Sequence, residues 1–299
     1  MKILLTGSSG FLGKNILKTI CNDPNDIFTL NRYNAYYNFD LSSGIPFFSN
    51  SFDVVIHNAG LAHVNPKNQY QNSLFYDINV NGTINLLSAL SNITVPEKFV
   101  FISSVSVYGL NQGEYINENT PLQAEDPYGR SKIAAEYIVK KWCEEHNVIC
   151  TILRLPLVVG ANPPGNLGSM IGAIKKGYYF NIGGGNARKS MVLVEDIAKY
   201  ILKAGEVGGI YNLTDGYHPN FEELSQLIAK QLGKYKVLNM PYLPAKVAAV
   251  IGNLAGKFAP LNTDKLNKIT STLTFDDSKA RAAFGWNPTP VLEGFKINS

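Results

Sequence analysis

The sequence of 299 residues is poor in cysteine, in strong charge imbalance and in long apolar stretches. Its three cysteines, Cys21, Cys143 and Cys150, are odd in number and lack metal-ligand spacing, so we expect reduced thiols and no metal. The net charge of +4 comes without a basic run, which argues against nucleic-acid binding. Because Met1 leads directly into an apolar strand, no signal peptide is predicted and the expected location is cytoplasmic.

The longest apolar stretch is still too short for a membrane-spanning helix. Such a helix needs roughly 20 apolar residues, whereas Ala245–Ala255, AKVAAVIGNLA, is interrupted by Lys246 and Asn253. We expect a packed helix there, with a helix lying on a membrane surface as the alternative, and no membrane insertion. The overall balance, 45% hydrophobic and 17% charged residues, is typical of a globular protein with an ample core.

A glycine-rich turn stands near the start of the chain, in MKILLTGSSGFLG. A buried strand over Ile3–Leu5 is predicted to enter the turn and a helix over Phe11–Ile20 to leave it. Strand, glycine turn and helix N-terminus together favour a site for the pyrophosphate of a dinucleotide. Gly7 permits the tight turn, Gly10 lets backbone approach phosphate, and Gly13 lets the helix lie close to the sheet. The spacing is GxxGxxG rather than GxGxxG.

Apolar runs and helical patterns alternate through the first half of the chain. The expected strands are Ile3–Leu5, Ile27–Leu30, Val54–His57, Phe99–Ser103 and Ile149–Leu153. The expected helices are Phe11–Ile20, Leu74–Leu90 and Ser131–Glu145. This alternation predicts an α/β fold, a Rossmann-like doubly wound parallel sheet with helices on both faces. We expect residues 1–155 to form a dinucleotide-binding domain, completed by a return segment at about 190–213.

The texture changes after Leu155, where glycine and proline become dense up to Gly168. Such a stretch is typical of loops over a substrate cleft. We expect residues 156–299 to form mostly a smaller C-terminal α/β domain that binds substrate. Its predicted elements are a strand and helix over Met191–Ala204, a strand over Gly209–Leu213, and helices over Phe221–Leu232, Pro241–Ala259 and Ser278–Phe284.

A second motif, DPYGRSK, carries acid–base chemistry. Asp126 is expected to cap a helix and Pro127 to occupy its first position, which places Tyr128 and Lys132 on one helix face. An unperturbed phenol has a pKa near 10. A neighbouring ammonium and a cationic nicotinamide are expected to lower that pKa, so that Tyr128 acts as general acid or base.

A serine completes the set at the end of the Phe99–Ser103 strand. The carboxyl ends of strands line the ligand crevice of an open α/β sheet. Ser104 is expected there, donating a hydrogen bond to the substrate oxygen and sharing its proton with Tyr128. Ser106 is a possible helper, and Ser103 is the alternative if the register differs by one residue.

Several motifs together resemble one family. TGSSGFLG, HNAG, YDINVNGT, FISSVSVYG and PYGRSK are similar to the extended short-chain dehydrogenases/reductases, which include nucleotide-sugar epimerases, dehydratases and reductases. The resemblance continues to the closing FDDSKARAAFGWNP. It implies Ser104, Tyr128 and Lys132 as the catalytic set, NAD or NADP as cofactor, and a homodimer. AGLAHV, RLPLVVG, NLGSM and RKSMVLVEDIA resemble the branch of UDP-sugar 4-epimerases and UDP-4-keto-6-deoxy-N-acetylhexosamine reductases.

The resemblance also implies a set of cofactor contacts. Besides Tyr128 and Lys132 these are Gly7, Ser9, Gly10, Phe11, Leu12 and Gly13 at the pyrophosphate, Asp40 and Leu41 at the adenine, Asn58, Ala59 and Gly60 under the cofactor, Asn79 supporting the catalytic helix, Ile102, and Leu155 and Leu157 at the nicotinamide. NAD enzymes often carry an acidic residue after the second strand. Asn31 and Arg32 stand there instead, which favours NADP modestly, since Arg32 can bind a 2′-phosphate.

The substrate contacts follow less directly. The family's late diphosphate-binding arginine has no counterpart in LNKITSTLTFDD, so Arg188 or Lys189 is expected to take that role. Other expected contacts are Asn166 and Leu167 at a uracil or its ribose, and His63 in a loop near the cleft. His57 ends a strand and is expected to be structural.

These observations favour a nucleotide-sugar oxidoreductase acting at carbon 4 of a UDP-hexose or UDP-N-acetylhexosamine. The preferred interpretation is a 4-ketoreductase in surface-polysaccharide sugar synthesis, and the alternative is a UDP-sugar 4-epimerase. A 4,6-dehydratase is disfavoured, because Ser103-Ser104-Val105 lacks the acidic pair that such enzymes place beside the serine. A small carbonyl compound or sterol as substrate, and a non-catalytic dinucleotide sensor, are further alternatives.

Overall fold

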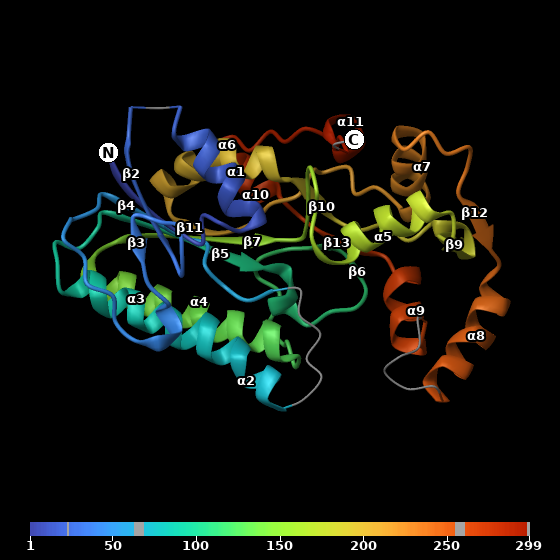
Figure 1. Ribbon diagram of the computed structural model, residues 1–299, viewed down its shortest axis with the longest axis horizontal. Helices are drawn as coiled ribbons and strands as arrows, with labels where there is room; N and C mark the ends of the chain where they lie inside the picture. The colour runs from blue at the N-terminus through green and yellow to red at the C-terminus, as the bar shows by residue number, and fades with distance from the viewer. Residues whose placement is uncertain (23, 63–68, 255–260, 298–299) are drawn as a thin grey trace.

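A computed structural model of the chain describes residues 1–22, 24–62, 69–254 and 261–297. Its centre is a parallel sheet of seven strands in the order β11-β7-β5-β4-β1-β2-β3 (Figure 1). The strands are β1 (Lys2–Thr6), β2 (Asp26–Asn31), β3 (Tyr37–Asn38), β4 (Val54–His57), β5 (Lys98–Ser104), β7 (Ile149–Leu155) and β11 (Gly209–Asn212). The predicted α/β fold with a doubly wound parallel sheet is therefore confirmed.

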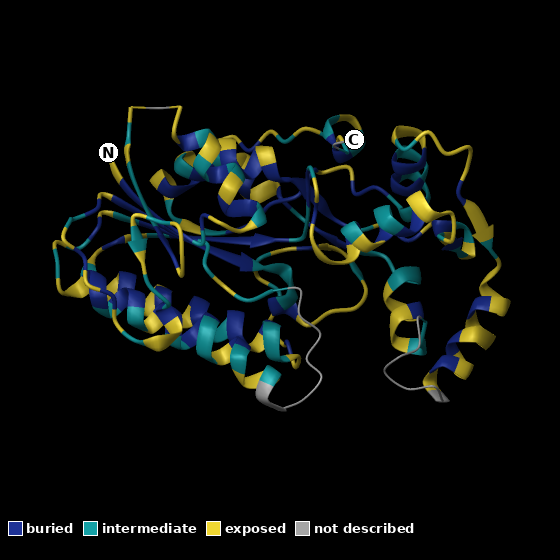
Figure 2. Cartoon of the chain, viewed as in Figure 1, coloured by how far each residue is buried: buried dark blue, intermediate teal, exposed yellow. Residues whose placement is uncertain are grey.

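Helices cover both faces of the sheet (Figure 1). On one face lie α1 (Phe11–Ile20), α6 (Val194–Val207) and α10 (Ser278–Phe284), and on the other α2 (Gln69–Tyr76), α3 (Gly82–Ser91) and α4 (Pro127–His146). Because side chains alternate along a strand, Ile3 and Leu5 pack with the first group while Leu4 packs with the second. Both faces are thus buried, and the central strands are continuous apolar runs (Figure 2).

The chain returns to the sheet late. After β10 (Met191–Leu193), helix α6 crosses the sheet face, and β11 pairs in parallel with β7. The predicted strand and helix over Met191–Ala204 and the strand over Gly209–Leu213 are confirmed. Residues far apart in sequence therefore form one edge of the sheet.

The remaining elements gather at the carboxyl end of the sheet (Figure 1). They are β6 (Gly113–Ile116) paired with β13 (Leu273–Phe275), β8 (Leu157–Val159) paired with β10, β9 (Phe180–Ile182) paired with β12 (Leu238–Met240), and the helices α5 (Gly165–Lys176), α7 (Phe221–Gln231), α8 (Tyr242–Leu254), α9 (Thr263–Thr270) and α11 (Val291–Gly294). Every helix within the described ranges is too short or too polar to cross a membrane.

Two predicted boundaries need correction, and a third lies partly outside the described residues. The stretch after Leu155 contains a strand, β8, and the start of α5 rather than loop alone. Its prolines do not break α5, because they end at Pro164, the residue before the helix, and so lie outside its hydrogen-bonded turns. The predicted helix Leu74–Leu90 is divided by a π-helical turn, η2 (Asp77–Asn81). The predicted helix Pro241–Ala259 is described only as α8, since residues 255–260 lie outside the described residues.

His57 lies inside the sheet core with both ring nitrogens hydrogen-bonded. Its Nδ1 is 2.7 Å from Thr6 Oγ1 and its Nε2 is 2.9 Å from Thr83 Oγ1. Burial, and secondarily the charge of Lys132, lower the pKa of His57 from 6.5 to about 3. The ring is therefore neutral in the folded protein and carries a structural role, as its position in the sequence indicates.

This neutral histidine makes a pH-dependent contribution to stability. Between pH 6.5 and about 3 the unfolded chain binds a proton at His57 that the folded chain does not. The free energy of unfolding should therefore fall as the pH drops through this window, by up to ~1.4 kcal/mol per pH unit. His57→Gln should show a shallower fall in urea unfolding at successive pH values. Parallel curves for the two proteins would contradict this account.

Candidate active site

The glycine turn packs tightly between the sheet and α1. Gly7 adopts a φ of +68°, and a Cβ on it would lie 2.7 Å from the Cα of Ala59. A Cβ on Gly13 would lie 2.1 Å from the carbonyl oxygen of Gly7. Glycine is therefore required at position 13 because the helix packs against the loop residues Gly7 and Ser8, rather than against the sheet. Gly10 is the N-cap residue of α1 and makes no side-chain hydrogen bond to the first N–H groups of the helix, which leaves those groups available to a ligand as far as the described residues show. These residues suit the pyrophosphate of NAD or NADP.

Asn31 supports the turn from the end of β2. Its Nδ2 donates to Ser8 Oγ over 2.7 Å, and its Oδ1 accepts from the Ser9 backbone N–H over 3.4 Å. The side chain of Asn31 thus faces the loop rather than solvent. Arg32, next in sequence, is exposed. Of the two residues expected to contact the cofactor ribose, only Arg32 projects freely from the end of the strand.

The segment after β4 packs against the glycine turn. Asn58 Nδ2 donates to the carbonyl oxygen of Gly7 over 3.0 Å, and the Ala59 N–H donates to Thr6 Oγ1 over 3.0 Å. Gly60 follows, with Asn79 and Lys132 beside it. The predicted cofactor residues of this turn therefore lie directly beside the glycine loop.

Asn79 links the segment after β4 to helix α4 by hydrogen bonds. Its Oδ1 accepts from the Leu61 N–H over 2.6 Å, and its Nδ2 donates to Ser131 Oγ over 2.9 Å. Asn79 lies in the π-helical turn, and such turns occur mostly as single bulges within helices, often at functional sites. Sequence periodicity does not reveal the turn, because one inserted residue leaves the apolar pattern on either side intact.

Two capping interactions set the positions of the catalytic candidates. β5 ends at Ser104, whose Oγ accepts from the Ser106 N–H over 3.1 Å and also lies 3.1 Å from Ser106 Oγ. Helix α4 begins after Asp126, whose Oδ1 accepts from the Gly129 N–H over 3.0 Å, with Pro127 at the first position. The predicted N-cap is confirmed. Both ends converge at the carboxyl edge of the sheet.

Ser104, Tyr128 and Lys132 come together at this edge. Tyr128 stands beside Ser104, close enough for the serine hydroxyl to lower the pKa of the phenol. Lys132 is buried one turn further along α4, where its Nζ donates to the carbonyl oxygen of Ile102 over 2.8 Å. The same ammonium lies 4.7 Å from the centre of the Phe101 ring. The arrangement can polarise an oxygen bound beside Tyr128 and exchange a proton with it.

The charges at this site differ from those expected. Burial raises the pKa of Tyr128, against a smaller lowering by the Ser104 hydrogen bond, and the Asp126 carboxylate raises it further. The prediction that the Lys132 ammonium lowers this pKa is wrong for the protein by itself, because that ammonium is directed at a backbone carbonyl. Burial lowers the pKa of Lys132 to about 8, opposed by the Glu136 carboxylate.

A buried ion pair behind the catalytic residues was not anticipated from the sequence. Arg154 Nε and Nη2 donate to the two carboxylate oxygens of Glu136 over 3.1 and 2.7 Å. Ser103 Oγ also donates to Glu136, so its hydroxyl is engaged with the ion pair, whereas Ser104 stands beside Tyr128. Arg154 Nη1 further donates to Tyr108 Oη over 3.1 Å, and Tyr108 donates to Asn212. The one feature of the sequence that could have indicated a buried ion pair is Arg154 within the otherwise apolar strand ICTILRL.

The adenine-side and nicotinamide-side residues occupy the expected ends of elements. Asp40 Oδ1 accepts from the Ser42 N–H over 2.9 Å and so caps a 3₁₀ turn, η1 (Leu41–Ser43), in which Leu41 is buried. Leu155 ends β7 and Leu157 begins β8, next to the sheet's carboxyl edge.

The predicted substrate contacts are only partly available. Asn166 and Leu167 lie in the first turn of α5, but the Leu167 side chain is 2% exposed in the core between α5 and α7, which leaves none of its side-chain surface for a ligand. Arg188 Nη1 donates to the carbonyl oxygens of Tyr217 and His218 over 3.3 and 3.0 Å, and thus anchors a loop. His63 lies outside the described residues.

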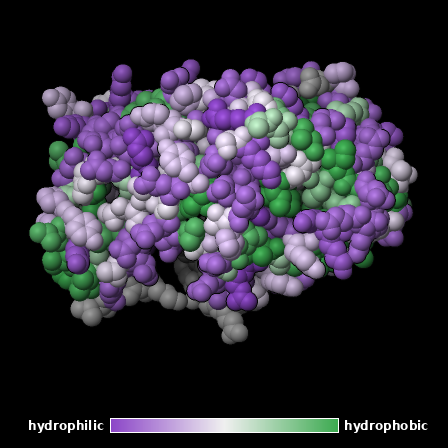
Figure 3. Space-filling view, turned by 180° about the vertical axis from the view of Figure 1, so that it is seen from behind, coloured by the Kyte–Doolittle hydropathy of each residue, from purple (hydrophilic) through white to green (hydrophobic). Residues whose placement is uncertain are grey.

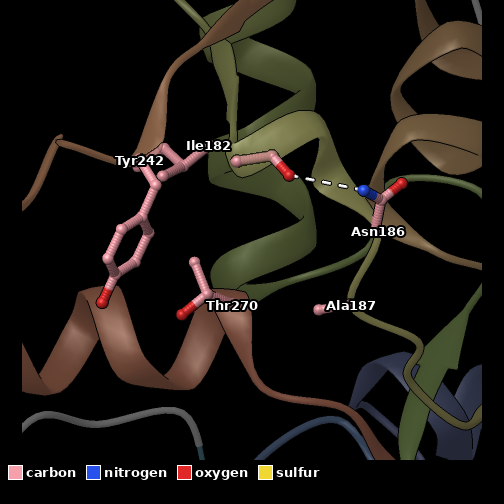
Figure 4. Close-up of a pocket in the computed structure, with 6 residues that line it drawn as sticks. Ile182, Asn186, Ala187, Tyr242 and Thr270 are labelled. Atoms are coloured by element: carbon pink, nitrogen blue, oxygen red, sulfur yellow. Dashed lines mark hydrogen bonds between the residues drawn. The ribbon is translucent and has the colours of Figure 1, made fainter. Parts of the chain in front are cut away.

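Lys189 follows by two residues Ala187, which lines a pocket that the sequence did not indicate. Burial and the nearby Lys268 lower the pKa of Lys189 to about 8. The pocket has a volume of about 330 Å³ and lies between the end of β9 with the following 3₁₀ turn, η4 (Gly183–Gly185), the start of α8 and the end of α9 (Figure 4). Its lining residues are Ile182, Gly183, Asn186, Ala187, Tyr242 and Thr270. The residues come from distant parts of the chain, which explains why no local pattern marks the pocket.

Comparisons with known proteins agree with this arrangement. Residues 3–214 match the sequence model of the NAD dependent epimerase/dehydratase family. The chain is 29% identical over 311 residues to the N-acetyl-alpha-D-glucosaminyl-diphospho-ditrans,octacis-undecaprenol 4-epimerase of Escherichia coli O157:H7, covering 98% of this chain and 92% of that protein. It is 28% identical over 323 residues to the UDP-glucose 4-epimerase of Vibrio cholerae, covering 98% and 93%.

A solved structure shows the same fold. The UDP-glucose 4-epimerase of Thermus thermophilus, in complex with NAD, matches with a TM-score of 0.72 at 21% identity. The match covers 96% of this chain and 94% of that one. The similarity therefore extends beyond the sheet to the elements around the pocket.

Proposed function

Because the chain belongs to the NAD-dependent epimerase/dehydratase family, we propose that it is a 4-epimerase of a UDP-hexose or UDP-N-acetylhexosamine. The observation that carries the proposal is the meeting of Tyr128, Ser104 and Lys132 beside the glycine turn. The epimerase names of the relatives support it. In this interpretation, the elements of residues 156–299 outside the return segment bind the sugar nucleotide.

The residues divide the chemistry as follows. The glycine turn binds the pyrophosphate of the dinucleotide, whose nicotinamide supplies a hydride acceptor and donor when bound. Tyr128 removes the proton of the carbon-4 hydroxyl and returns it to the keto oxygen, while Ser104 holds that oxygen by a hydrogen bond. When the Lys132 ammonium leaves the carbonyl oxygen of Ile102 and turns to the bound ligands, its charge lies beside the phenol of Tyr128 and favours the phenolate.

Lys189 is our candidate for the substrate diphosphate. It follows by two residues Ala187, which lines the pocket with Tyr242, and its ammonium lies near the charge of Lys268. With a pKa of about 8, Lys189 is mostly protonated at neutral pH, and a bound diphosphate raises that pKa because it favours the charged form. Arg188 is less suited, since its guanidinium already donates to two carbonyl groups.

The deciding experiment examines the purified protein for a bound nucleotide and then for turnover. We expect NAD or NADP to be released on denaturation, and UDP-N-acetylglucosamine or UDP-glucose to be converted to its 4-epimer without net oxidation. Steady NADPH consumption with a UDP-4-keto-6-deoxy-N-acetylhexosamine would instead establish a 4-ketoreductase. Dinucleotide binding without turnover of any of these sugars would favour a sensor. Light scattering tests the homodimer, which stays a prediction.

One observation keeps the reductase as second candidate. Arg32 is exposed at the end of β2, where no carboxylate repels a 2′-phosphate, so the site suits NADPH. Arg32→Ser should weaken NADPH binding by about 10- to 150-fold while leaving NADH binding nearly unchanged, since a charge-assisted contact is worth ~1.5–3 kcal/mol. Fluorescence titration with both nucleotides measures this, and Lys18→Ser on α1 is the matched control. Equal losses for both nucleotides would assign Arg32 no role in cofactor choice.

A further inference from the structure

Helix α8 places its larger apolar side chains in solvent. Leu243, Val247, Val250 and Ile251 are 74%, 60%, 50% and 60% exposed. At helical spacing these four positions lie within one face of the helix, which we call the apolar face of α8. The opposite face carries Ala245 and Ala249, which are fully buried against Leu266 of α9 and its neighbours. The helix therefore buries small residues and exposes large ones.

This orientation differs from that of a packed helix, the main expectation for AKVAAVIGNLA. Single exposed apolar residues are ordinary on a protein surface, whereas a contiguous exposed patch marks an interaction site. Figure 3 shows hydrophobic side chains gathered at the lower left, over the end of the molecule that α8 forms. In Figure 2 the same helix carries exposed residues along its outer side.

The segment of the chain that contains α8 is cationic. Lys246 lies on α8 itself, and Lys234 and Lys236 are exposed in the connection before β12. The described residues between Leu232 and Thr270 include five lysines, and Asp264 is the one carboxylate among them. Tyr235, between two of the lysines, is fully exposed. Exposed apolar side chains in a lysine-rich segment, together with an exposed tyrosine, are typical of a helix lying in a lipid interface.

We propose that the apolar face of α8 docks on an anionic lipid bilayer. A second copy of the chain fits this surface poorly, because a two-fold contact would bring two copies of this lysine-rich segment together, and Asp264 is the one carboxylate among its described residues. Anionic headgroups supply the complementary charge, and the acyl boundary accepts the aliphatic side chains.

The position of α8 gives the docking a consequence for the site. Tyr242, the first residue of α8, lines the pocket beside Ala187 and Thr270 (Figure 4). Docking therefore holds this pocket close to the lipid surface. The proposal concerns the surface alone and does not depend on which sugar the site takes.

Sedimentation of the full chain with lipid vesicles tests the proposal. Vesicles of equal parts phosphatidylglycerol and phosphatidylcholine should bind the protein, and vesicles of phosphatidylcholine alone should bind it much more weakly. The triple variant Leu243→Ser, Val247→Ser and Ile251→Ser should bind at least about tenfold less. The charge variant Lys234→Gln, Lys236→Gln and Lys246→Gln should lose about fivefold per lysine and most of its salt dependence.

The controls separate lipid binding from other causes. Phe47→Ser with Val207→Ser removes exposed apolar residues elsewhere, at 86% and 47% exposure, and should bind vesicles like the wild type. Thermal unfolding and conversion of a soluble UDP-sugar should be unchanged in the α8 variants, so a failure of the proposed activity is recognised separately. Wild-type protein that stays in the supernatant would overturn the proposal. So would a wild-type dimer that the serine variant converts to monomer without any vesicle binding.

Discussion

Tyr128→Phe is expected to lower the turnover number for carbon-4 epimerisation by about 10²–10⁴-fold, the usual worth of a positioned general acid–base group. The phenol hydroxyl is the group that Ser104 positions at the sheet edge, and phenylalanine keeps the ring without it. Packing should persist, because the ring of Tyr128 lies 6.0 Å from that of Phe75 and needs no hydroxyl for that contact. The rate of 4-epimer formation from a UDP-sugar, at saturating substrate, measures the loss.

The matched control for this variant lies on the same helix. Tyr137→Phe removes a hydroxyl from a side chain that is 69% exposed, and it should leave turnover and melting temperature unchanged. Dinucleotide content after purification should be equal in both variants and the wild type. If Tyr128→Phe retained near wild-type turnover, the proton would have to pass through another group and our assignment would be wrong.

Glu136→Leu is expected to lower the free energy of unfolding by about 3–5 kcal/mol, because it leaves a buried arginine without its partner. The Arg154 side chain is 3% exposed and donates two hydrogen bonds to Glu136, so water cannot replace the carboxylate. The loss is measurable by urea unfolding at neutral pH. Lys132 loses a neighbouring carboxylate as well, and the alkaline limb of activity against pH should move to lower pH.

A double variant separates the cost of an unpaired buried charge from the cost of changing the shape of the Glu136 side chain. Glu136→Leu with Arg154→Met replaces both charges by apolar side chains of similar length, and it should recover much of the stability lost in Glu136→Leu. Ser103 and Tyr108 each lose one partner in this variant, so recovery should be incomplete. If the double variant had a lower free energy of unfolding than Glu136→Leu, the loss in Glu136→Leu could not be attributed to an unpaired Arg154 charge.

Local patterns were sufficient wherever one or two adjacent residues decide the conformation. Helix α1 over Phe11–Ile20 and the cap at Asp126 agree with the sequence, because a glycine turn and a side-chain cap act within four residues. The placement of Ser104 beside Tyr128 also followed, since both stand at ends of elements that a parallel sheet brings to one edge.

Contacts between distant segments could not be predicted in the same way. The pairing of Glu136 with Arg154 depends on how α4 packs against β7, and the pocket of Ile182 and Tyr242 depends on the β9–β12 pairing. The raised pKa of Tyr128 depends on burial by residues from several elements. Sequence spacing carries no information on any of these distances.

The late return of the chain to the sheet bears on how the protein is made. A nascent chain that ends after β7 has no β11, so one edge of β7 presents unpaired N–H and C=O groups. It also lacks α6, whose Ile197 and Ile201 cover the same sheet face as α1. The first half of the protein should therefore stay open and dependent on chaperones during synthesis until Asn212 has left the ribosome. Expression trials that truncate the chain near Leu155 should then yield aggregate rather than a smaller folded protein.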